Sequence, residues 1–243
     1  MTRRKTNALF VLLFALLLGG LGWWASQQRP AIPLRPIGLF TSLPIIWAES
    51  EQLGDLLQGD APTHWAKVEI ERRGRIVPLD TLDQLDRGLT RLVIAQPRPL
   101  SPSENVALDA WVRAGGQLLL IVDPALTAHS AFPVGDPRRP QDIALLSPIL
   151  SRWGLELTFD DGQAEGEVLV QAGAVAIPVN LPGRWRLPHG SPCRSEATGL
   201  LADCRIGRGK VLALADAEVL SASDEGSHQR ALAELLDRAF ARR

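Results

Sequence analysis

A strand, a helix and a second strand can be read directly from residues 91–122, and this unit constrains the fold more than any other stretch. Residues 91–95 (RLVIA) and 117–122 (QLLLIV) are short, almost wholly apolar runs. Such runs are typical of parallel strands that are buried on both faces. The pattern therefore predicts neighbouring strands of one parallel sheet, joined by a helical crossover.

The helix between these strands has clear start and stop signals. Ser101 suits an N-cap, Pro102 suits the first turn, and Glu104 completes a capping box. Gly115 and Gly116 supply the C-terminal stop. These signals fix the crossover between the two predicted strands.

The same reading extends over the rest of the chain. Strands are expected at 37–43, 75–79 and 155–159, helices at 47–57, 81–89 and 142–153, and a helix or an extended stretch at 63–73. Beyond residue 160, β-like segments at 167–171, 174–179, 184–187, 199–206 and 210–215 resemble antiparallel hairpins, and 227–243 reads as an amphipathic helix. We predict an α/β protein with a flavodoxin-like parallel sheet flanked by helices, followed by an antiparallel β-rich part and a final helix.

The N-terminal run 8–25 (ALFVLLFALLLGGLGWWA) has no charged side chain. As a helix it covers about 27 Å, close to the thickness of a bilayer core of about 30 Å. Basic residues precede it and two tryptophans end it, which favours a transmembrane anchor with a cytoplasmic N-terminus. A cleaved signal peptide is the alternative, and both readings export the rest of the chain. We therefore expect a single-pass protein of the inner (cytoplasmic) membrane with its soluble part in the periplasm.

These signals divide the chain into five expected parts. They are a cytoplasmic N-terminus (1–7), a transmembrane anchor (8–25), a Pro-rich linker (26–36), an α/β domain (37–159) and a β-rich extension whose final helix packs on the same domain (160–243).

The composition limits which ligands and cross-links this chain is expected to have. The formal net charge is −1, so the sequence shows no bias toward nucleic acid. The two cysteines, Cys193 and Cys204, suit one disulfide in an exported domain, although free thiols remain an alternative. Two cysteines without a nearby histidine pair are not a zinc pattern, so no metal site is expected.

Known catalytic and cofactor motifs are missing from the sequence. Lys210 follows Gly209 in a loop too short for a Walker A motif, no G-x-G-x-x-G follows the first strand, and no G-x-S-x-G or G-x-C-x-G elbow occurs. The four histidines are scattered. We therefore expect no catalytic residue and no cofactor.

Polar residues at predicted strand ends are the candidate binding site, because ligands of open α/β sheets bind beyond the carboxyl ends of the strands. A long loop at 125–141 adds further candidates, including two arginines that suit an anionic or polar ligand. The candidate residues are Thr41, Ser42, Gln96, Asp123, His129, Arg138, Arg139 and Asp216. A solvated loop without a ligand is the alternative reading.

The stretch 92–124 resembles the auxiliary, GldG-like components of ABC-type transport systems. A strand, a P-x-x-L-S-x-x-E helix start, GG, a second strand and DP follow in the family's order, and 145–157 (LLSPILSRWGLEL) resembles its next helix and strand. The resemblance covers 37–159. It implies a fold like that of class I glutamine amidotransferases without the catalytic cysteine, and association with a separate ABC permease and ATPase.

The leading hypothesis is a non-enzymatic, membrane-anchored periplasmic accessory subunit of an ABC-type transport system that binds a partner protein or a polar ligand. The alternatives are a hydrolase or amidotransferase-like enzyme with a divergent active site around Asp123 and His129, and a scaffold for envelope assembly. The sequence does not identify the transported substrate, the partner or the oligomeric state.

Overall fold

The computed structural model describes residues 35–47, 63–85, 88–221 and 226–241. The predicted anchor 8–25 and nearly all of the predicted helix 47–57 lie outside the described residues. Within the described part, no helix combines the length and the apolar character needed to cross a membrane. Residues Arg35–Arg243 form one compact unit.

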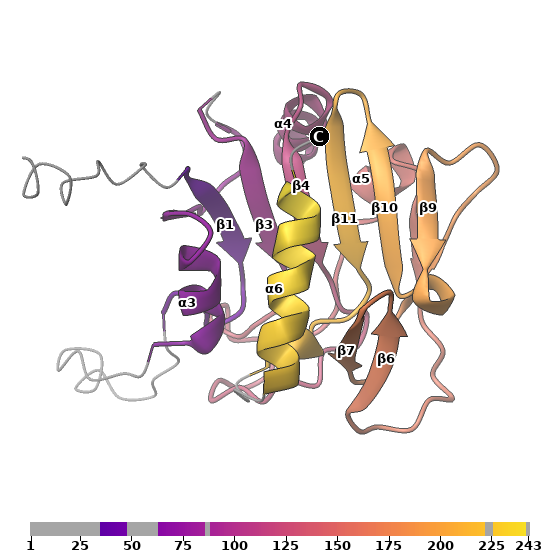
Figure 1. Cartoon of the computed structure of the whole chain (residues 1–243). Coiled ribbons are helices and arrows are strands. Elements are labelled where there is room, and N and C mark those ends of the chain that lie inside the picture. Colours follow the sequence, from indigo (N-terminus) through magenta and orange to yellow (C-terminus); the bar gives the residue numbers. More distant parts are fainter. Residues whose placement is uncertain (1–34, 48–62, 86–87, 222–225, 242–243) are drawn as a thin grey trace, which may run out of the picture. The chain divides into compact units, whose positions relative to one another are not determined.

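A seven-stranded sheet is the centre of this unit, in the order β2-β1-β3-β4-β11-β10-β9 (Figure 1). Its strands are β1 (Ile37–Thr41), β2 (Ile76–Pro78), β3 (Arg91–Ala95), β4 (Gln117–Ile121), β9 (Cys193–Glu196), β10 (Leu201–Ile206) and β11 (Gly209–Leu214). The pairs from β2 to β11 are parallel, whereas β10 pairs antiparallel with both β11 and β9. Two small antiparallel sheets are formed by β5 (Glu156–Thr158) with β8 (Arg184–Arg186) and by β6 (Val168–Ala172) with β7 (Val175–Val179).

Helices cover both faces of the sheet. Helices α3 (Trp65–Glu71) and α6 (Gly226–Phe240) lie on one face, and α4 (Pro102–Arg113) and α5 (Ser147–Arg152) lie on the other (Figure 1). Two short 3₁₀ turns, η1 (Ala197–Gly199) and η2 (Glu218–Leu220), complete the described elements. The predicted α/β class with helices on both faces of a mainly parallel sheet is confirmed.

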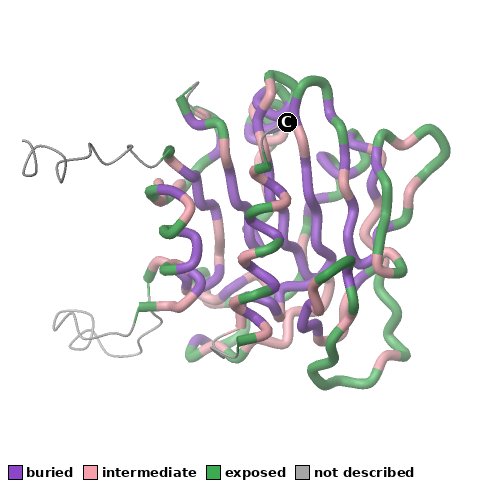
Figure 2. The backbone as a smooth tube through the Cα atoms, in the orientation of Figure 1, coloured by how far each residue is buried: buried purple, intermediate pink, exposed green. Residues whose placement is uncertain are grey.

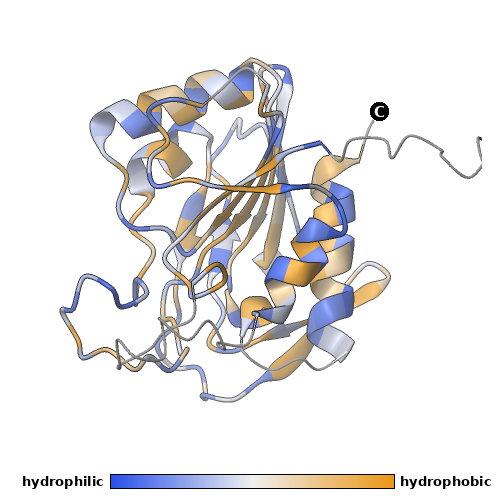
Figure 3. Cartoon of the chain, turned by 90° about the vertical axis from the view of Figure 1, so that its left-hand side faces the viewer, coloured by the Kyte–Doolittle hydropathy of each residue, from blue (hydrophilic) through white to orange (hydrophobic). Residues whose placement is uncertain are grey.

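Strict alternation along the strands divides the core into two layers, because successive side chains of a strand point to opposite faces. Val93 packs in the layer beneath α6 with Leu232 and Leu236, whereas the next residue, Ile94, packs in the layer beneath α4 with Leu108. The central strands β1, β3, β4 and β11 are buried almost throughout (Figure 2). Figure 3 shows apolar strands between helices that mix hydrophobic and hydrophilic residues. Both faces are therefore covered by amphipathic helices.

The C-terminal part of the chain completes the main sheet. Strand β11 pairs parallel with β4, with Val211 opposite Leu118 and Leu214 opposite Ile121. The sequence predicted only antiparallel hairpins in this region, and that prediction is wrong for one edge of β11. The strand is antiparallel to β10 along one edge and parallel to β4 along the other.

A disulfide joins Cys193 of β9 to Cys204 of β10, which are directly opposite each other in the strand register. Their Cα atoms are 4.0 Å apart, and both side chains are buried against the α5 layer of the core. The crosslink therefore ties the outermost strand of the sheet to its neighbour.

Two predicted helices differ from the structure. Among the described residues of 81–89, the chain forms turns, because Thr81 and Asp83 bond to each other through side chain and backbone and so compete with helical hydrogen bonds. The predicted helix 142–153 is reduced to α5, and Pro148 lies in its first turn instead of interrupting it. The predicted strand 155–159 forms β5, which pairs with β8 outside the main sheet.

The capping box of α4 does more than start the helix. The Ser101 and Leu82 amides donate to the Glu104 carboxylate at 2.9 and 3.1 Å, and the Arg98 guanidinium donates to it at 2.7 Å. Glu104 is 1% exposed. These hydrogen bonds hold the pKa of Glu104 far below its usual value, with the bond from Arg98 as the largest cause. One buried carboxylate therefore fixes the N-terminus of α4 and the loop that contains Leu82.

Replacing Glu104 with Gln should lower the free energy of unfolding by about 2–3 kcal/mol, because an amide NH₂ would then face several N–H donors in a buried site. Denaturant unfolding of the full chain in detergent measures this change. The matched variant Glu71→Gln, at an exposed position of α3, should stay within about 0.5 kcal/mol of wild type. Equal stability of the two variants would contradict the role given to Glu104.

Candidate functional site

The carboxyl ends of the parallel strands meet at one edge of the sheet, as the sequence predicted from their polar residues. Ser42 follows β1, Gln96 follows β3, and Asp123 and Asp216 lie two residues beyond the ends of β4 and β11. Asp123 is 1% exposed, and Gln96 and Asp216 are completely buried. The topology therefore brings four of the eight predicted site residues to one buried edge.

Gln96 links these strand ends to the long loop. Its side-chain oxygen accepts from the Asp123 amide at 2.8 Å, and its Nε2 donates to the carbonyls of Asp123 and Gln141 at 3.1 and 2.7 Å. The Ser42 hydroxyl donates to the Gln96 carbonyl and accepts from the Gln141 amide at 3.0 Å. Gln96 has a φ of 38°, a left-handed value that is unusual for a residue other than glycine. Its three side-chain hydrogen bonds hold it in this conformation.

The two buried carboxylates accept hydrogen bonds from backbone amides. Asp123 accepts from Ala125 at 2.8 Å and from Ala217 at 3.1 Å, one amide for each oxygen. Asp216 accepts from Glu218 at 2.7 Å and from Asn180 at 3.0 Å in the same way. The carboxylates thus hold together the segments that leave β4, β7 and β11.

Burial governs the protonation of this pair. Burial raises the pKa of Asp123 to about 6, although its two backbone hydrogen bonds act in the opposite direction, and the nearby charge of Glu218 raises it further. Burial also raises the pKa of Asp216 well above its ordinary value, and the neighbouring charge of Asp123 adds to that shift. One carboxyl group therefore becomes harder to ionise when the other is charged.

The other four candidates do not join this cluster. The Thr41 hydroxyl accepts from the Leu43 amide at 2.9 Å in a local turn. His129 is exposed in the long loop. Arg138 forms an ion pair with Asp136 at 2.7 Å and lies over the Phe132 ring. Arg139 pairs with Asp142 at 3.0 Å and donates to the Phe132 carbonyl at 2.9 Å. The arginines therefore bond within their own loop and do not close over the strand ends.

The polar side-chain atoms of this cluster already have hydrogen-bond partners within the chain. Both oxygens of each buried aspartate accept a backbone hydrogen bond, and the Ser42 hydroxyl both donates and accepts one. The two cysteines of the chain are joined in the disulfide. Within the described ranges, no hydrogen bond joins Asp123 to His129. The predicted cluster thus braces the strand ends, and its oxygens point at amides of the chain itself.

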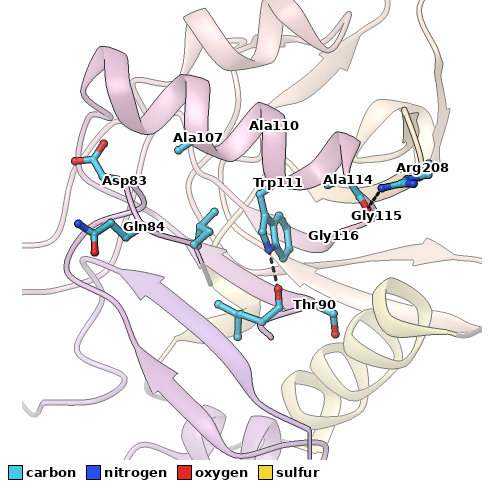
Figure 4. A pocket seen from close by; sticks show the side chains of 12 residues that line it. Asp83, Gln84, Thr90, Ala107, Ala110, Trp111, Ala114, Gly115, Gly116 and Arg208 are labelled. Carbon is cyan, nitrogen blue, oxygen red and sulfur yellow. Dashed lines mark hydrogen bonds between the residues drawn. The ribbon is translucent and has the colours of Figure 1, made fainter. Parts of the chain in front are cut away.

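A separate groove of about 620 Å³ lies at the amino ends of the strands, against α4 (Figure 4). The small side chains of Ala107, Ala110 and Ala114 line it, and Trp111 forms part of its wall and donates to the Leu89 carbonyl at 2.7 Å. Its charged lining residues are Asp83 and Arg208, which lie at opposite ends of the groove in Figure 4. The groove is therefore a concave surface in which no acid and base lie close together.

Sequence reasoning missed several groups around the strand ends. The amides of Asn180, Ala217 and Glu218 and the backbone of Gln141 all bond to the predicted residues. Backbone donors carry no residue-type signal, so the sequence offered no means of finding them. Glu218 was detectable only through its position two residues after a predicted strand-end aspartate.

The comparisons with known proteins agree with part of the resemblance. A family model described as "ABC-type uncharacterized transport system" matches residues 69–180. This match supports an auxiliary family of ABC-type transport and an accessory role associated with such a system. No curated protein matches the chain in sequence.

Solved structures resemble the chain at low sequence identity. An exo-beta-1,4-mannosidase, Op5Man5, from Opitutaceae bacterium strain TAV5 has 13% identity and a TM-score of 0.51, over 90% of this chain and 38% of the mannosidase chain. A GH42 beta-galactosidase, Gan42B, from G. stearothermophilus has 12% identity and a TM-score of 0.48, over 85% of this chain and 30% of that chain. A thua-like protein from Bacteroides uniformis ATCC 8492 has 10% identity and a TM-score of 0.47, over 87% and 92% of the two chains. The chain thus spans well under half of the glycosidases, and the likeness to the mannosidase shows the fold alone.

The raised pKa of Asp123 predicts a specific dependence of stability on pH. The pKa is about 6 in the folded chain and about 4 in an unfolded chain, so the stability that protonation of Asp123 contributes is complete below pH 4. That stability is lost as the pH rises through about 6. Between pH 5 and pH 7, Asp123→Asn should therefore lose less stability than wild type, by on the order of 1 kcal/mol.

Denaturant unfolding of the full chain in detergent with a chelator, at both pH values, measures this difference. The matched variant Asp161→Asn, at an exposed loop position, should follow the wild-type pH dependence. Parallel pH profiles for wild type and Asp123→Asn would contradict the assignment of a raised pKa to Asp123.

Proposed function

We propose that this protein is a non-enzymatic accessory subunit of an ABC-type transport system, held in the inner membrane by residues 8–25 with its α/β unit in the periplasm. In this proposal it belongs with the GldG-like components and has an amidotransferase-like sheet without a nucleophile. The α/β unit binds a partner protein of the transporter, and the chain assembles with a separately encoded permease and ATPase.

The family match over residues 69–180 is the observation that carries this proposal. The matched region contains α4, β3 and β4, which are central to the seven-stranded sheet, and it extends through β7. The match therefore covers Gln96, Asp123 and Asn180 of the carboxyl edge, but not Ser42 or Asp216, together with most of the groove along α4.

Three features of the molecule support the details. The strand-end polar groups are occupied by backbone hydrogen bonds, which suits a binding or structural role better than nucleophilic catalysis. The Cys193–Cys204 disulfide suits an oxidising compartment such as the periplasm. The apolar, uncharged character of residues 8–25 supports the anchor.

The anchor is tested by fractionating cells that make the full chain with a C-terminal epitope. We expect the chain to remain in the membrane pellet after alkaline extraction and the epitope to be digested by protease added to spheroplasts. A variant with Leu13→Arg and Leu16→Arg should leave the membrane fraction, because each central Arg costs about 2.5–3.5 kcal/mol in insertion. Intact wild-type chain in the cytosolic fraction would refute the anchor and the periplasmic location.

The accessory role is tested by affinity purification of the tagged full chain from its native membranes in a mild detergent. We expect an ABC permease and its ATPase to be recovered with it in a fixed ratio, and to be recovered also when either of those subunits carries the tag. The chain with an unrelated anchor in place of residues 8–25 separates contacts made by the α/β unit from contacts made by the anchor. Purification of the chain without either transporter subunit, after crosslinking in intact cells, would refute the accessory role.

A further inference from the structure

A histidine and two glutamates converge beside the carboxyl edge of the sheet, outside the network of Gln96 and Asp123. His228 lies in the first turn of α6, Glu218 begins η2, and Glu167 immediately precedes β6. One potential ligand atom from each residue lies within 4.8 Å of those from the other two. Three separate segments of the chain thus direct metal-binding groups to one point.

The spacing of these groups differs from that of hydrogen-bonded pairs. His228 Nε2 lies 3.5 Å from a carboxylate oxygen of Glu167 and 4.0 Å from one of Glu218. Hydrogen bonds of this kind are about 2.7–3.2 Å long. Two ligands bound at about 2.0–2.2 Å to one tetrahedral ion lie about 3.3–3.6 Å apart. The observed distances therefore leave room for an ion between the imidazole and the carboxylates.

Burial and mobility suit the three residues to different parts in such a site. The His228 side chain is completely buried, so its ring position is fixed by packing, and its ring meets the Trp65 ring in a T-shaped contact at 6.4 Å between centroids. Glu218 is mostly buried, and the Thr127 hydroxyl donates to its other carboxylate oxygen at 3.4 Å. Glu167 is more exposed, with 36% of its side chain accessible. The distance from His228 to Glu167 already suits two ligands of one ion, whereas Glu218 must approach His228 by about half an ångström to close the site.

The chemistry of the three ligands selects the class of ion. Two ionised carboxylates and a neutral imidazole carry a charge of about −2, which a divalent cation balances. An imidazole nitrogen suits Zn²⁺ and neighbouring transition metals, whereas Mg²⁺ and Ca²⁺ prefer oxygen ligands alone. Three protein ligands also leave a fourth tetrahedral position for water or for a group on another molecule.

We propose that Glu167, Glu218 and His228 form a binding site for a divalent transition-metal ion of the Zn²⁺ class. The bound ion ties the start of β6 and the turn after β11 to the first turn of α6. This proposal does not depend on the accessory role, because the site lies within one chain.

The test uses the full chain, purified in detergent without a polyhistidine tag and stripped with a chelator. Calorimetric titration with Zn²⁺ should show one ion per chain at micromolar or lower concentration. Co²⁺ in the same site should give the visible absorption of a tetrahedral complex, which Zn²⁺ then displaces. Saturating Zn²⁺ should also raise the melting temperature, because the ion binds only the folded chain.

Three glutamate variants assign the site. Glu167→Gln and Glu218→Gln should each weaken Zn²⁺ binding by about tenfold or more, since each removes an anionic ligand. The matched variant Glu165→Gln, an exposed glutamate in the same loop, should bind as wild type does. Glu167→Gln is safe for folding because Glu167 is exposed, so the result does not rest on a variant of the buried His228.

Two outcomes would overturn the proposal. One is the absence of saturable Zn²⁺ binding below millimolar concentration in the wild-type chain. The other is binding that Glu167→Gln and Glu218→Gln leave unchanged, which would place the ion on surface histidines elsewhere. Neither outcome bears on recovery of the chain with a permease and an ATPase, so the two proposals succeed or fail separately.

Discussion

The parallel pairing of β11 with β4 is the contact on which the rest of this structure depends. It places Leu212 beside Leu119 at the centre of the sheet, although a long stretch of chain separates them. Because β11 runs in the same direction as β4, the residues that follow both strands leave at the same edge. The Ala217 amide can therefore reach Asp123, and α6 can return across the face of the sheet. A β11 strand paired only with β10 would leave that face of the core uncovered.

The carboxyl edge shows how a buried carboxylate can be tolerated without a cation beside it. Burial of Asp123 and Asp216 disfavours their charged forms, and the raised pKa of each group records that cost. Four backbone amides offset part of it, two for each side chain. The amides belong to turns that need acceptors, since a buried N–H without a partner is itself costly. The carboxylates and the turns thus satisfy each other.

Glu104, at the N-terminus of α4, solves the same problem by a different route. It has an arginine partner as well as backbone donors, and its pKa is lowered instead of raised. The contrast follows from the cation, because the hydrogen bond from Arg98 is the largest cause of the lowered pKa of Glu104, whereas burial is the largest cause of the raised pKa of Asp123. Similar carboxylates in one fold therefore differ in protonation according to whether a cation can reach them.

Much of this fold could be predicted from local patterns. The apolar runs at β3 and β4 and the capping box at Ser101 fixed a βαβ unit, because each of those signals lies within a few neighbouring residues. The partner of β11 could not be predicted, since the apolar run of five residues at 211–215 suits a hairpin as well as a central strand. The turns around Leu82 were also hidden, because their hydrogen bonds come from Glu104 on another element.

The candidate site was predictable to the extent that strand polarity decides it. Residues that follow parallel strands must gather at one edge, so Ser42, Gln96, Asp123 and Asp216 were found from position alone. What those residues do there could not be found in that way. Their partners are backbone amides of distant segments, and the arginines of the long loop are held by acids only two or three residues away.

The topology also gives the amino and carboxyl edges of the sheet different characters. The amino edge carries a groove lined by the small residues of α4, whereas the turns at the carboxyl edge are rich in buried acids. Glu218 has two roles at the carboxyl edge. Its amide donates to Asp216 in the buried cluster, and its side chain faces His228. The turn that closes the strand ends is thus the same turn that orients an acid toward α6. The backbone of Glu218 is already held by the turn after β11. A ligand bound by both Glu218 and His228 would therefore connect this turn directly to the first turn of α6.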